Sequence, residues 1–462
     1  MKVSVTDRIK KIVEECVELG ETVKVTDPAA FRGATIDSLV HTAVFGDSPE
    51  DRGSARWIIK SAGIDLGVYS ASIQGLYEAM GRGEAGGYSV PAINIRGMTY
   101  DVAASIFRTA IKNDSGTFIF EIAKSEIAYT YQRPAEYTVV MLAAGIKTGY
   151  KGPVFIQGDH FQVNAKKHKD DPAKEVQGVR DLISEAVKAG FYNIDIDTST
   201  LVDLSKGSLS EQQRLNYEVG AELTLHVRTH EPSGITVSVG GEIGEVGEKN
   251  STVEELVAYM EGYNAAMNGK GVGISKVSVQ TGTSHGGIPL PDGSVAEVAL
   301  DFDTLEKLSK TAKEKFGLSG AVQHGASTLP DELFHRFPET GTSEIHLATG
   351  FQNMIYDSSH LPSDLRDKVY AGLNEQFASE RSEGQTDEQF IYKVRKKGFG
   401  LAKREFWELP EGAKNGICGE LEEKFDFLFK KLGVAGNKGD VEKYITHTPA
   451  PVSLEEEIGG AS

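Results

Sequence analysis

A helix that leads directly into a strand can be read from residues 179–197, VRDLISEAVKAGFYNIDID. Gly190 supplies the glycine with which many helices end, and the apolar run at 193–196 follows it and closes on Asp197. This pattern predicts an amphipathic helix that delivers the chain into a buried strand with a carboxylate at its C-terminal end. The apolar residues that recur at the spacing of one helix face are Val179, Leu182, Ile183, Ala186 and Val187.

Eight strand-like runs occur in the middle of the chain, and most of them are separated by segments long enough for a crossover helix. Eight alternating units are what a closed parallel (β/α)8 barrel, the TIM barrel fold, requires. An open doubly wound sheet shows a similar alternation, so the residues at the strand ends must distinguish the two folds. The runs lie at residues 90–93, 118–122, 154–156, 193–196, 235–239, 276–279, 321–323 and 344–347.

We predict that the barrel spans residues 88–355, with one extension before it and another after it. Residues 1–87 contain helical patterns and form an N-terminal helical extension. Residues 356–450 are helical in pattern and form a C-terminal extension. The tail at 451–462 is polar and rich in glutamate, and we predict it to be disordered.

The composition argues against several classes of partner. The chain has 462 residues and a formal net charge of −18, which disfavours nucleic acid and anionic membrane surfaces. Cys16 and Cys418 are the only cysteines, so the sequence has no disulfide framework and suits a reducing compartment. The N-terminal segment carries charges where a signal peptide would be apolar, and we therefore expect a cytoplasmic protein.

Polar residues collect where barrel enzymes carry their catalytic groups, at the C-terminal ends of the strands. Four of the eleven histidines follow or end a predicted strand, which favours the closed barrel over the open sheet. The residues at these positions, in strand order, are Asn94, Glu121 with Lys124, Asp159 with His160, Asp197, Glu242, His285, His324 and His346.

Histidines at consecutive positions of one barrel mouth predict a metal site. Three neutral imidazoles with a vacant fourth position are typical of catalytic Zn²⁺, and we assign His160, His285 and His324 as the ligands. Carboxylates nearby can orient these ligands or bind a second ion. His346 either contacts a substrate or packs in the barrel, and the sequence leaves both open.

Glycine-rich stretches follow the sixth, seventh and eighth predicted strands. Gly286, Gly325, Ser327 and Thr349 lie in them. Loops after the last two strands are the usual phosphate site of a barrel, where backbone N–H groups and hydroxyls bind the phosphate oxygens. We therefore expect these residues to bind a phosphate group.

The barrel portion, from about residue 85 to about 355, resembles the class II, zinc-dependent ketose-bisphosphate aldolases. No single stretch is specific, but several occur in the family's order over most of a barrel. They are GGYSVPAINI, FIQGDH, AGFYNIDIDTST, GGEIGEVGE, VQTGTSHG, QHGASTLPDELF and SEIHLATG.

The resemblance implies roles for the residues at the strand ends. His160, His285 and His324 would bind the catalytic Zn²⁺, and Glu242 and Asp197 would belong to a second site for a divalent or monovalent cation. Asp159 matches the residue that moves the proton of the hydroxyl at the cleaved bond. The chemistry agrees, because cleavage next to a carbonyl forms an enediolate that a Lewis acid stabilises, and no lysine Schiff base is needed.

The sequence departs from the family at residues expected to contact the substrate, and not at those expected to bind the metal. Glu245 or Glu248 in the loop after the fifth strand could serve as the acid that exchanges the proton on the ketone fragment, although neither falls on the family's position for it. The loop after the sixth strand lacks the lysine that members have near the phosphate, and Lys124, Lys166 or Lys167 could replace it. Glu121 and His346 stand where members usually have Gln and Asn. Aldolase chemistry is therefore better supported than fructose 1,6-bisphosphate as its substrate.

We accordingly predict a Zn²⁺-dependent aldolase of carbohydrate metabolism, such as glycolysis. It would cleave a phosphorylated ketose, fructose 1,6-bisphosphate or a related sugar phosphate, into dihydroxyacetone phosphate and an aldehyde. One alternative is a zinc hydrolase with Asp159 as the base, and another is a non-catalytic barrel that binds sugar phosphates. The expected partners are a small anionic sugar phosphate and further copies of the chain in a homodimer or homotetramer.

Overall fold

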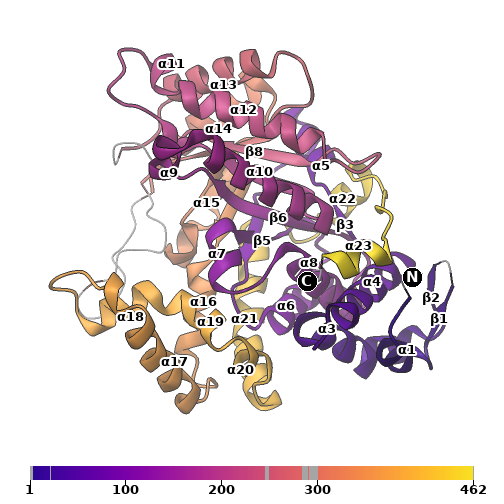
Figure 1. The fold of residues 1–462 in the computed structure, drawn as a ribbon. Helices are drawn as coiled ribbons and strands as arrows, with labels where there is room; N and C mark the ends of the chain where they lie inside the picture. Colours follow the sequence, from indigo (N-terminus) through magenta and orange to yellow (C-terminus); the bar gives the residue numbers. More distant parts are fainter. Residues whose placement is uncertain (1–3, 21, 245–248, 283–289, 291–299, 461–462) are drawn as a thin grey trace.

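The computed structural model describes residues 4–20, 22–244, 249–282, 290 and 300–460. Its centre is a closed parallel barrel of eight strands surrounded by helices, as predicted (Figure 1). Each strand pairs in parallel with the next, and the eighth pairs back with the first. The strands are β4 (Val90–Asn94), β5 (Ile119–Ala123), β6 (Gly152–Gln162), β7 (Asn193–Asp197), β8 (Ser238–Glu242), β9 (Lys276–Val279), β10 (Ala321–Gln323) and β11 (Glu344–Leu347).

The fifth barrel strand begins later than the sequence predicted. It runs from Ser238 through two glycines to Glu242, whereas the prediction ended it at residue 239, before the glycines. A Cβ atom on Gly240 would overlap the Asp195 carboxylate and the Lys276 side chain. The glycines are strand residues because their missing side chains leave room for charged groups inside the barrel.

Helices follow the barrel strands in the order expected of the fold. They are α6 (Thr99–Lys112), α7 (Lys124–Tyr129), α8 (Pro134–Thr148), α9 (Ala165–Asp170), α10 (Pro172–Ala189), α11 (Leu209–Gln212), α12 (Arg214–Arg228), α13 (Val253–Met267), α14 (Phe302–Phe316), α15 (Arg336–Glu339) and α16 (Thr349–Asp357). The helical face predicted from residues 179–187 is buried on α10. No helix in the part of the chain that the structure describes has the length and apolarity of a membrane span.

The N-terminal extension is not wholly helical, which corrects the sequence prediction. Strands β1 (Val17–Leu19) and β2 (Val23–Val25) form an antiparallel hairpin, and β3 (Val68–Ala71) pairs in parallel with β6. The helices of this extension are α1 (Asp7–Val13), α2 (Pro28–Ala30), α3 (Ile36–Phe45), α4 (Pro49–Leu66) and α5 (Gln74–Gly81). Helices α3 and α4 pack on α8, so the extension is attached to one side of the barrel.

The C-terminal extension is helical as predicted. It contains α17 (Ser363–Gln376), α18 (Asp387–Val394), the 3₁₀ helix η6 (Arg395–Lys397), α19 (Gly398–Leu401), α20 (Lys403–Trp407), α21 (Glu411–Lys431) and α22 (Lys438–Tyr444). Helix α21 packs along α6 and α16 and covers the barrel where its first and last helices meet.

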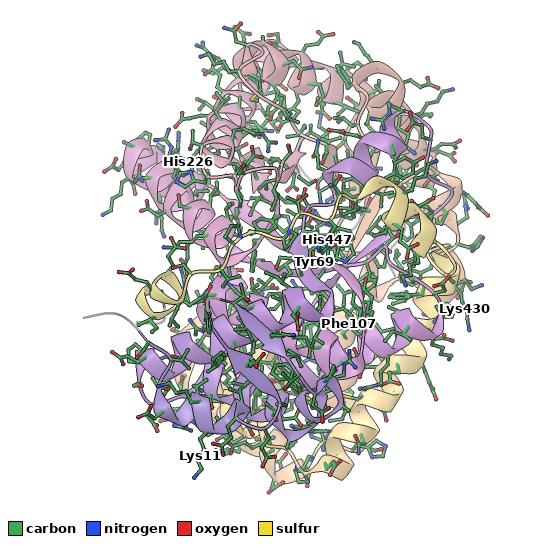
Figure 2. All side chains as sticks on the ribbon, turned by 90° about the vertical axis from the view of Figure 1, so that its right-hand side faces the viewer. Lys11, Tyr69, Phe107, His226, Lys430 and His447 are labelled. Carbon is green, nitrogen blue, oxygen red and sulfur yellow. The ribbon has the colours of Figure 1, made fainter. Side chains whose placement is uncertain are left out.

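The tail that we predicted to be disordered is ordered from residue 451 to residue 460. It contains helix α23 (Leu454–Gly459), which lies against α4. The Lys60 ammonium pairs with Glu457 at 2.5 Å, and the ring of His447 packs edge-on against Tyr69 of β3 (Figure 2). The glutamates that favoured disorder are therefore held by partners distant in the sequence.

Glycines let the segment from η6 to α19 lie directly on the barrel mouth. A Cβ atom on Gly97, after β4, would overlap the ring of Phe399, and one on Gly400 would overlap the carbonyl of Tyr129. The Phe399 ring packs on the backbone at Gly97, and the backbone at Gly400 lies against that of Tyr129, because neither glycine carries a side chain. The C-terminal extension is thereby fixed next to the loops that follow β4 and β5.

Substitution of Gly400 tests this contact. We expect Gly400→Ala to lower the free energy of unfolding by about 1–3 kcal/mol, because the added methyl group forces the two backbones apart. Gly419→Ala is the matched control, since Gly419 is exposed on α21 and its Cβ would meet no other atom. Urea unfolding measures both, and equal stability of Gly400→Ala and the unmodified chain would contradict the contact.

Candidate functional site

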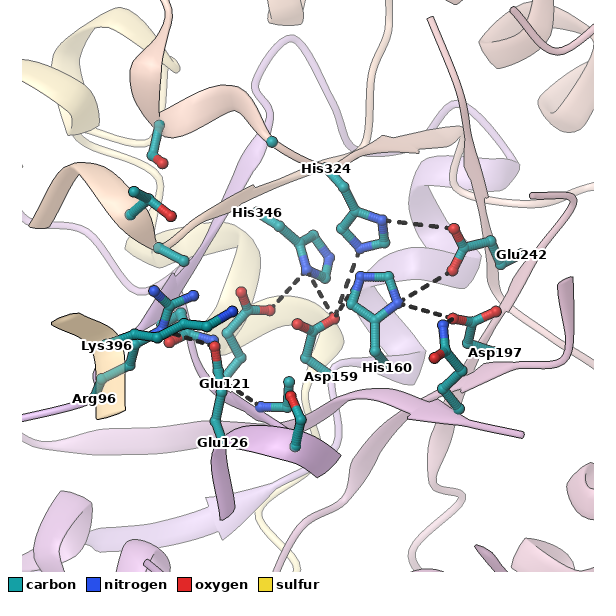
Figure 3. Close-up of a pocket in the computed structure, with 18 of the residues that line it drawn as sticks. Arg96, Glu121, Glu126, Asp159, His160, Asp197, Glu242, His324, His346 and Lys396 are labelled. Carbon is teal, nitrogen blue, oxygen red and sulfur yellow. Dashed lines mark hydrogen bonds and ion pairs between the residues drawn. The ribbon is translucent and has the colours of Figure 1, made fainter. Parts of the chain in front are cut away.

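A cavity of about 410 Å³ opens at the C-terminal ends of the barrel strands (Figure 3). Most of the residues singled out from the sequence line it, although they come from several strands. They are Asn94, Glu121, Asp159, His160, Asp197, Glu242, His324, Gly325, Ser327, His346 and Thr349. Of the remaining predicted residues, Lys124 is described but does not line the cavity, and Glu245, Glu248, His285 and Gly286 lie outside the described part of the chain.

Asp159 and His160 are neighbours in the sequence, and yet both line the cavity. Successive residues of a regular strand point to opposite faces. Strand β6 shifts its register against β7 between Gly158 and Phe161, and His160 has a left-handed φ of 42°. This bulge turns both side chains toward the barrel mouth. A strained histidine backbone at such a point is typical of a functional site.

Two histidines and a carboxylate form a group with the chemistry of a metal site. Ligand atoms of His160, Glu242 and His324 lie within 4.8 Å of one another. The Nδ1 atom of His160 is 3.3 Å from Glu242 Oε2 and 3.1 Å from Asp197 Oδ2. Imidazole nitrogens and carboxylate oxygens are ligands that suit Zn²⁺, so this donor set fits the metal expected from the sequence.

The Asp159 carboxylate lies among three imidazoles. Its Oδ1 atom is 3.3 Å from His346 Nδ1, 3.7 Å from His324 Nε2 and 3.8 Å from His160 Nε2. The side chain is buried, with 8% of it exposed, so few water molecules compete for its oxygens. A carboxylate in this position can accept a proton from a group bound in the cavity.

His346 has a carboxylate at each ring nitrogen. Nδ1 is 2.8 Å from Glu121 Oε2, and Nε2 is 2.7 Å from Glu344 Oε1. Burial alone would lower the pKa of His346, but the charges of Glu121 and Asp159 raise it well above its ordinary value. The surroundings therefore favour the protonated form of the ring, which lines the cavity. The structure thus favours a polar role for His346 over packing.

A buried charge network lies beneath the cavity. The Lys276 ammonium contacts Glu344 Oε1 at 2.5 Å, Gln157 Oε1 at 2.7 Å and Asp195 Oδ1 at 3.0 Å. Tyr77 of α5 donates a hydrogen bond to Glu344 from the other side. Because Glu344 also contacts His346, the network connects the interior of the barrel with the site.

The cationic side chains at the cavity are not the lysines that the sequence suggested. Lys124 does not line it, because its ammonium donates to the Gln162 carbonyl at 2.8 Å and lies 3.4 Å from Glu175. Lys166 and Lys167 are exposed on α9 and do not line it either. Arg96 and Lys396 line the cavity instead.

The chain matches a known protein family over most of its length. A sequence model described as "Fructose-bisphosphate aldolase class-II" matches residues 75–398, which is most of the chain. The chain belongs to the class II fructose-bisphosphate aldolase family. This membership supports an aldolase-type enzyme and confirms the resemblance seen in the motifs. No curated protein sequence matches the chain.

Solved structures share the fold at low sequence identity. Fructuronate-tagaturonate epimerase UxaE from Cohnella laeviribosi is 12% identical, with a TM-score of 0.58 over 92% of this chain and 90% of that one. A probable tagatose 6 phosphate kinase from Sinorhizobium meliloti 1021 is 16% identical, with a TM-score of 0.52 over 81% and 97%. The fructose-bisphosphate aldolase from Campylobacter jejuni is 18% identical, with a TM-score of 0.47 over 80% and 97%.

Removal of the buried ammonium tests the network beneath the cavity. We expect Lys276→Met to lower the free energy of unfolding by about 3–5 kcal/mol, because Glu344 and Asp195 keep their buried charges without a partner. Lys310→Met is the control, since the Lys310 side chain is 69% exposed and its pair with Glu314 contributes little. Urea unfolding of both variants is the measurement, and similar losses in the two would refute the network's role.

Proposed function

We propose that this chain is a zinc-dependent aldolase that reversibly cleaves a phosphorylated ketose into dihydroxyacetone phosphate, or a close analogue, and an aldehyde. The observation that supports this proposal most is the Asp159 carboxylate, which lies beside the donor set of His160, His324 and Glu242. A proton acceptor next to a Lewis acid is what aldol cleavage requires.

The metal would be bound by His160, His324 and Glu242, and the family resemblance adds His285. When bound, Zn²⁺ supplies the Lewis acidity that stabilises negative charge on the ketone fragment. Asp197, which accepts hydrogen bonds from Ser199 and Gln162, orients the His160 ring through Nδ1 or holds a second cation.

Asp159 acts on the substrate hydroxyl at the bond that breaks. It takes the hydroxyl proton, the electrons of that O–H bond form the aldehyde carbonyl, and the electrons of the broken carbon–carbon bond pass to the enediolate. The step reverses when Asp159 returns the proton during condensation. The charge of His346, 3.3 Å away, favours the ionised form of Asp159 in which it accepts a proton.

The acidic side chains around the reaction would select hydroxyl groups. Asn94 and Glu121 line the cavity from β4 and β5. Burial raises the pKa of Glu121 to about 8, against the opposing charge of His346. The Glu121 carboxylate, 2.8 Å from His346 Nδ1, and the Asn94 amide can accept hydrogen bonds from sugar hydroxyls in the cavity.

Metal removal tests the class of reaction. We expect a chelator to abolish ketose cleavage and added Zn²⁺ to restore it, because the enediolate charge is otherwise unstabilised. The measurement is trapping of the triose phosphate released from a panel of ketose phosphates, together with the metal content of the protein. Full activity without metal would reject the proposal, and release of inorganic phosphate without an aldehyde would favour the hydrolase.

Asp159→Asn tests the proton acceptor. We expect kcat to fall by about 10²- to 10⁴-fold, with the zinc content unchanged, because the amide cannot take the hydroxyl proton. Asp181→Asn is the control, since Asp181 is exposed on the outer side of α10. An Asp159→Asn enzyme with the kcat of the control would exclude Asp159 as the acceptor.

A further inference from the structure

We propose that Lys396, which the C-terminal extension supplies, binds the terminal anionic group of the substrate, and that the substrate carries one such group rather than two. This inference rests on the proposed function and deepens it. The anionic group is a phosphate or a carboxylate, because the ammonium can donate charged hydrogen bonds to the oxygens of either group.

Lys396 lines the cavity at the end away from the predicted metal ligands. Figure 3 shows Lys396 and Arg96 on one side, with Glu242 and Asp197 on the other. Lys396 is partly buried, and within the described residues its ammonium forms neither a hydrogen bond nor an ion pair. Its Nζ atom lies over the ring of Tyr129, 6.0 Å from the ring centre.

An ammonium in these surroundings favours an anion. Burial lowers the pKa of Lys396, and the positive charge of Arg96 lowers it further, while the more weakly felt charges of Glu126 and Glu380 oppose this shift. A bound anion would offset both effects, because it would place a negative charge directly against an ammonium that has no ion-pair partner among the described residues. The Ser327 and Thr349 hydroxyls line the same cavity and can donate to further oxygens of the anion.

Arg96 is already engaged by the protein. Its Nε atom is 2.7 Å from Glu126 Oε1, and its Nη1 atom donates to Gln352 Oε1 at 2.7 Å. Glu126 in turn accepts hydrogen bonds from Asn94 and from the Ala123 backbone. Arg96 is therefore held in place beside Lys396, and its charge is matched by a carboxylate.

The position of Lys396 is fixed by the packing of its neighbours. Arg395 donates to Asp357 and Asn353 of α16, at 2.9 and 2.5 Å. Gly400 lies against the Tyr129 carbonyl on the other side of Lys396. A short segment anchored at both ends presents its ammonium at one point, which is what selection of one terminal group requires.

The charges of the cavity explain why one anion is expected. Among the described residues that line the cavity, Arg96 is the one arginine and Lys396 the one lysine. The segments 245–248 and 283–299 contain neither lysine nor arginine in their sequence. The opposite end of the cavity holds Asp159, Asp197 and Glu242, and among the described residues it has no lysine or arginine, so a second phosphate there would lie beside three carboxylates. The carboxylates at the cavity are Glu121, Glu126, Asp159, Asp197 and Glu242.

Steady-state kinetics on three ketoses test the inference. The zinc-loaded enzyme would be assayed with a ketose phosphorylated only at its terminal carbon, with one that carries a terminal carboxylate, and with a ketose bisphosphate. We expect a higher kcat/KM for one of the single-anion ketoses than for the bisphosphate. The better of the two identifies the anion as phosphate or carboxylate.

Variants of Lys396 attribute this selection to its ammonium. We expect Lys396→Gln to raise KM for the preferred ketose by about 10- to 100-fold with little change in kcat, because a charged hydrogen bond to the substrate is lost. Lys396→Arg should restore part of the affinity. Lys397→Gln is the matched control, since Lys397 is the next residue of η6, pairs with Glu380 and does not line the cavity.

A binding measurement separates failure of this inference from failure of the proposed function. Calorimetric titration of the zinc-loaded protein with inorganic phosphate and with acetate should give binding that Lys396→Gln loses and Lys397→Gln keeps. Preference for the bisphosphate, or an unchanged KM in Lys396→Gln, would overturn the inference and leave the aldolase intact. If no ketose is cleaved, the proposed function fails, and the titration alone decides for or against Lys396.

Discussion

The Lys276 ammonium lies inside the barrel among the carboxylates of Asp195 and Glu344, and the site above depends on this contact. Glu344 begins β11, and His346 two residues later lies on the same face of the strand. Glu344 therefore holds Lys276 below and the His346 ring above, at 2.7 Å. His346 in turn contacts Asp159, so the charge at the base of the barrel orients the residue proposed to move the substrate proton.

Burial of the Lys276, Asp195 and Glu344 charges removes them from water, which costs free energy. Contacts with the surrounding residues offset this desolvation cost. Gly240 keeps the fifth strand free of a side chain where the Asp195 and Lys276 groups need space. Gln157 bridges the network by donating to Glu344 and accepting from Lys276. A polar interior in which each charge has a partner specifies one arrangement, because a slipped strand would leave charges unpaired.

Strand positions could be predicted from the sequence because apolar runs and helix-ending glycines are local signals. The charge network around Lys276 could not be predicted from the sequence. Charged residues within the apolar runs, such as Lys276, are visible there, but their partners depend on the order of the strands around the barrel. The bulge at His160 also has no local signal, because it arises from the pairing of β6 with β7. Helix α23 was missed for the same reason, since its Glu457 is paired with Lys60 on α4.

Lys396 shows how an extension can alter a site without changing the barrel. Strand-end residues were found because the fold directs every strand end to one mouth, but Lys396 comes from a segment with no strand. It reaches the cavity because Gly97 leaves room for the Phe399 ring and Gly400 lets its backbone lie against the Tyr129 carbonyl. The protein as a whole carries a net charge of −18, so a single ammonium at this point has a large local effect on which anions enter. Substrate choice in this chain is therefore expected to depend on how the extension packs as much as on the barrel itself.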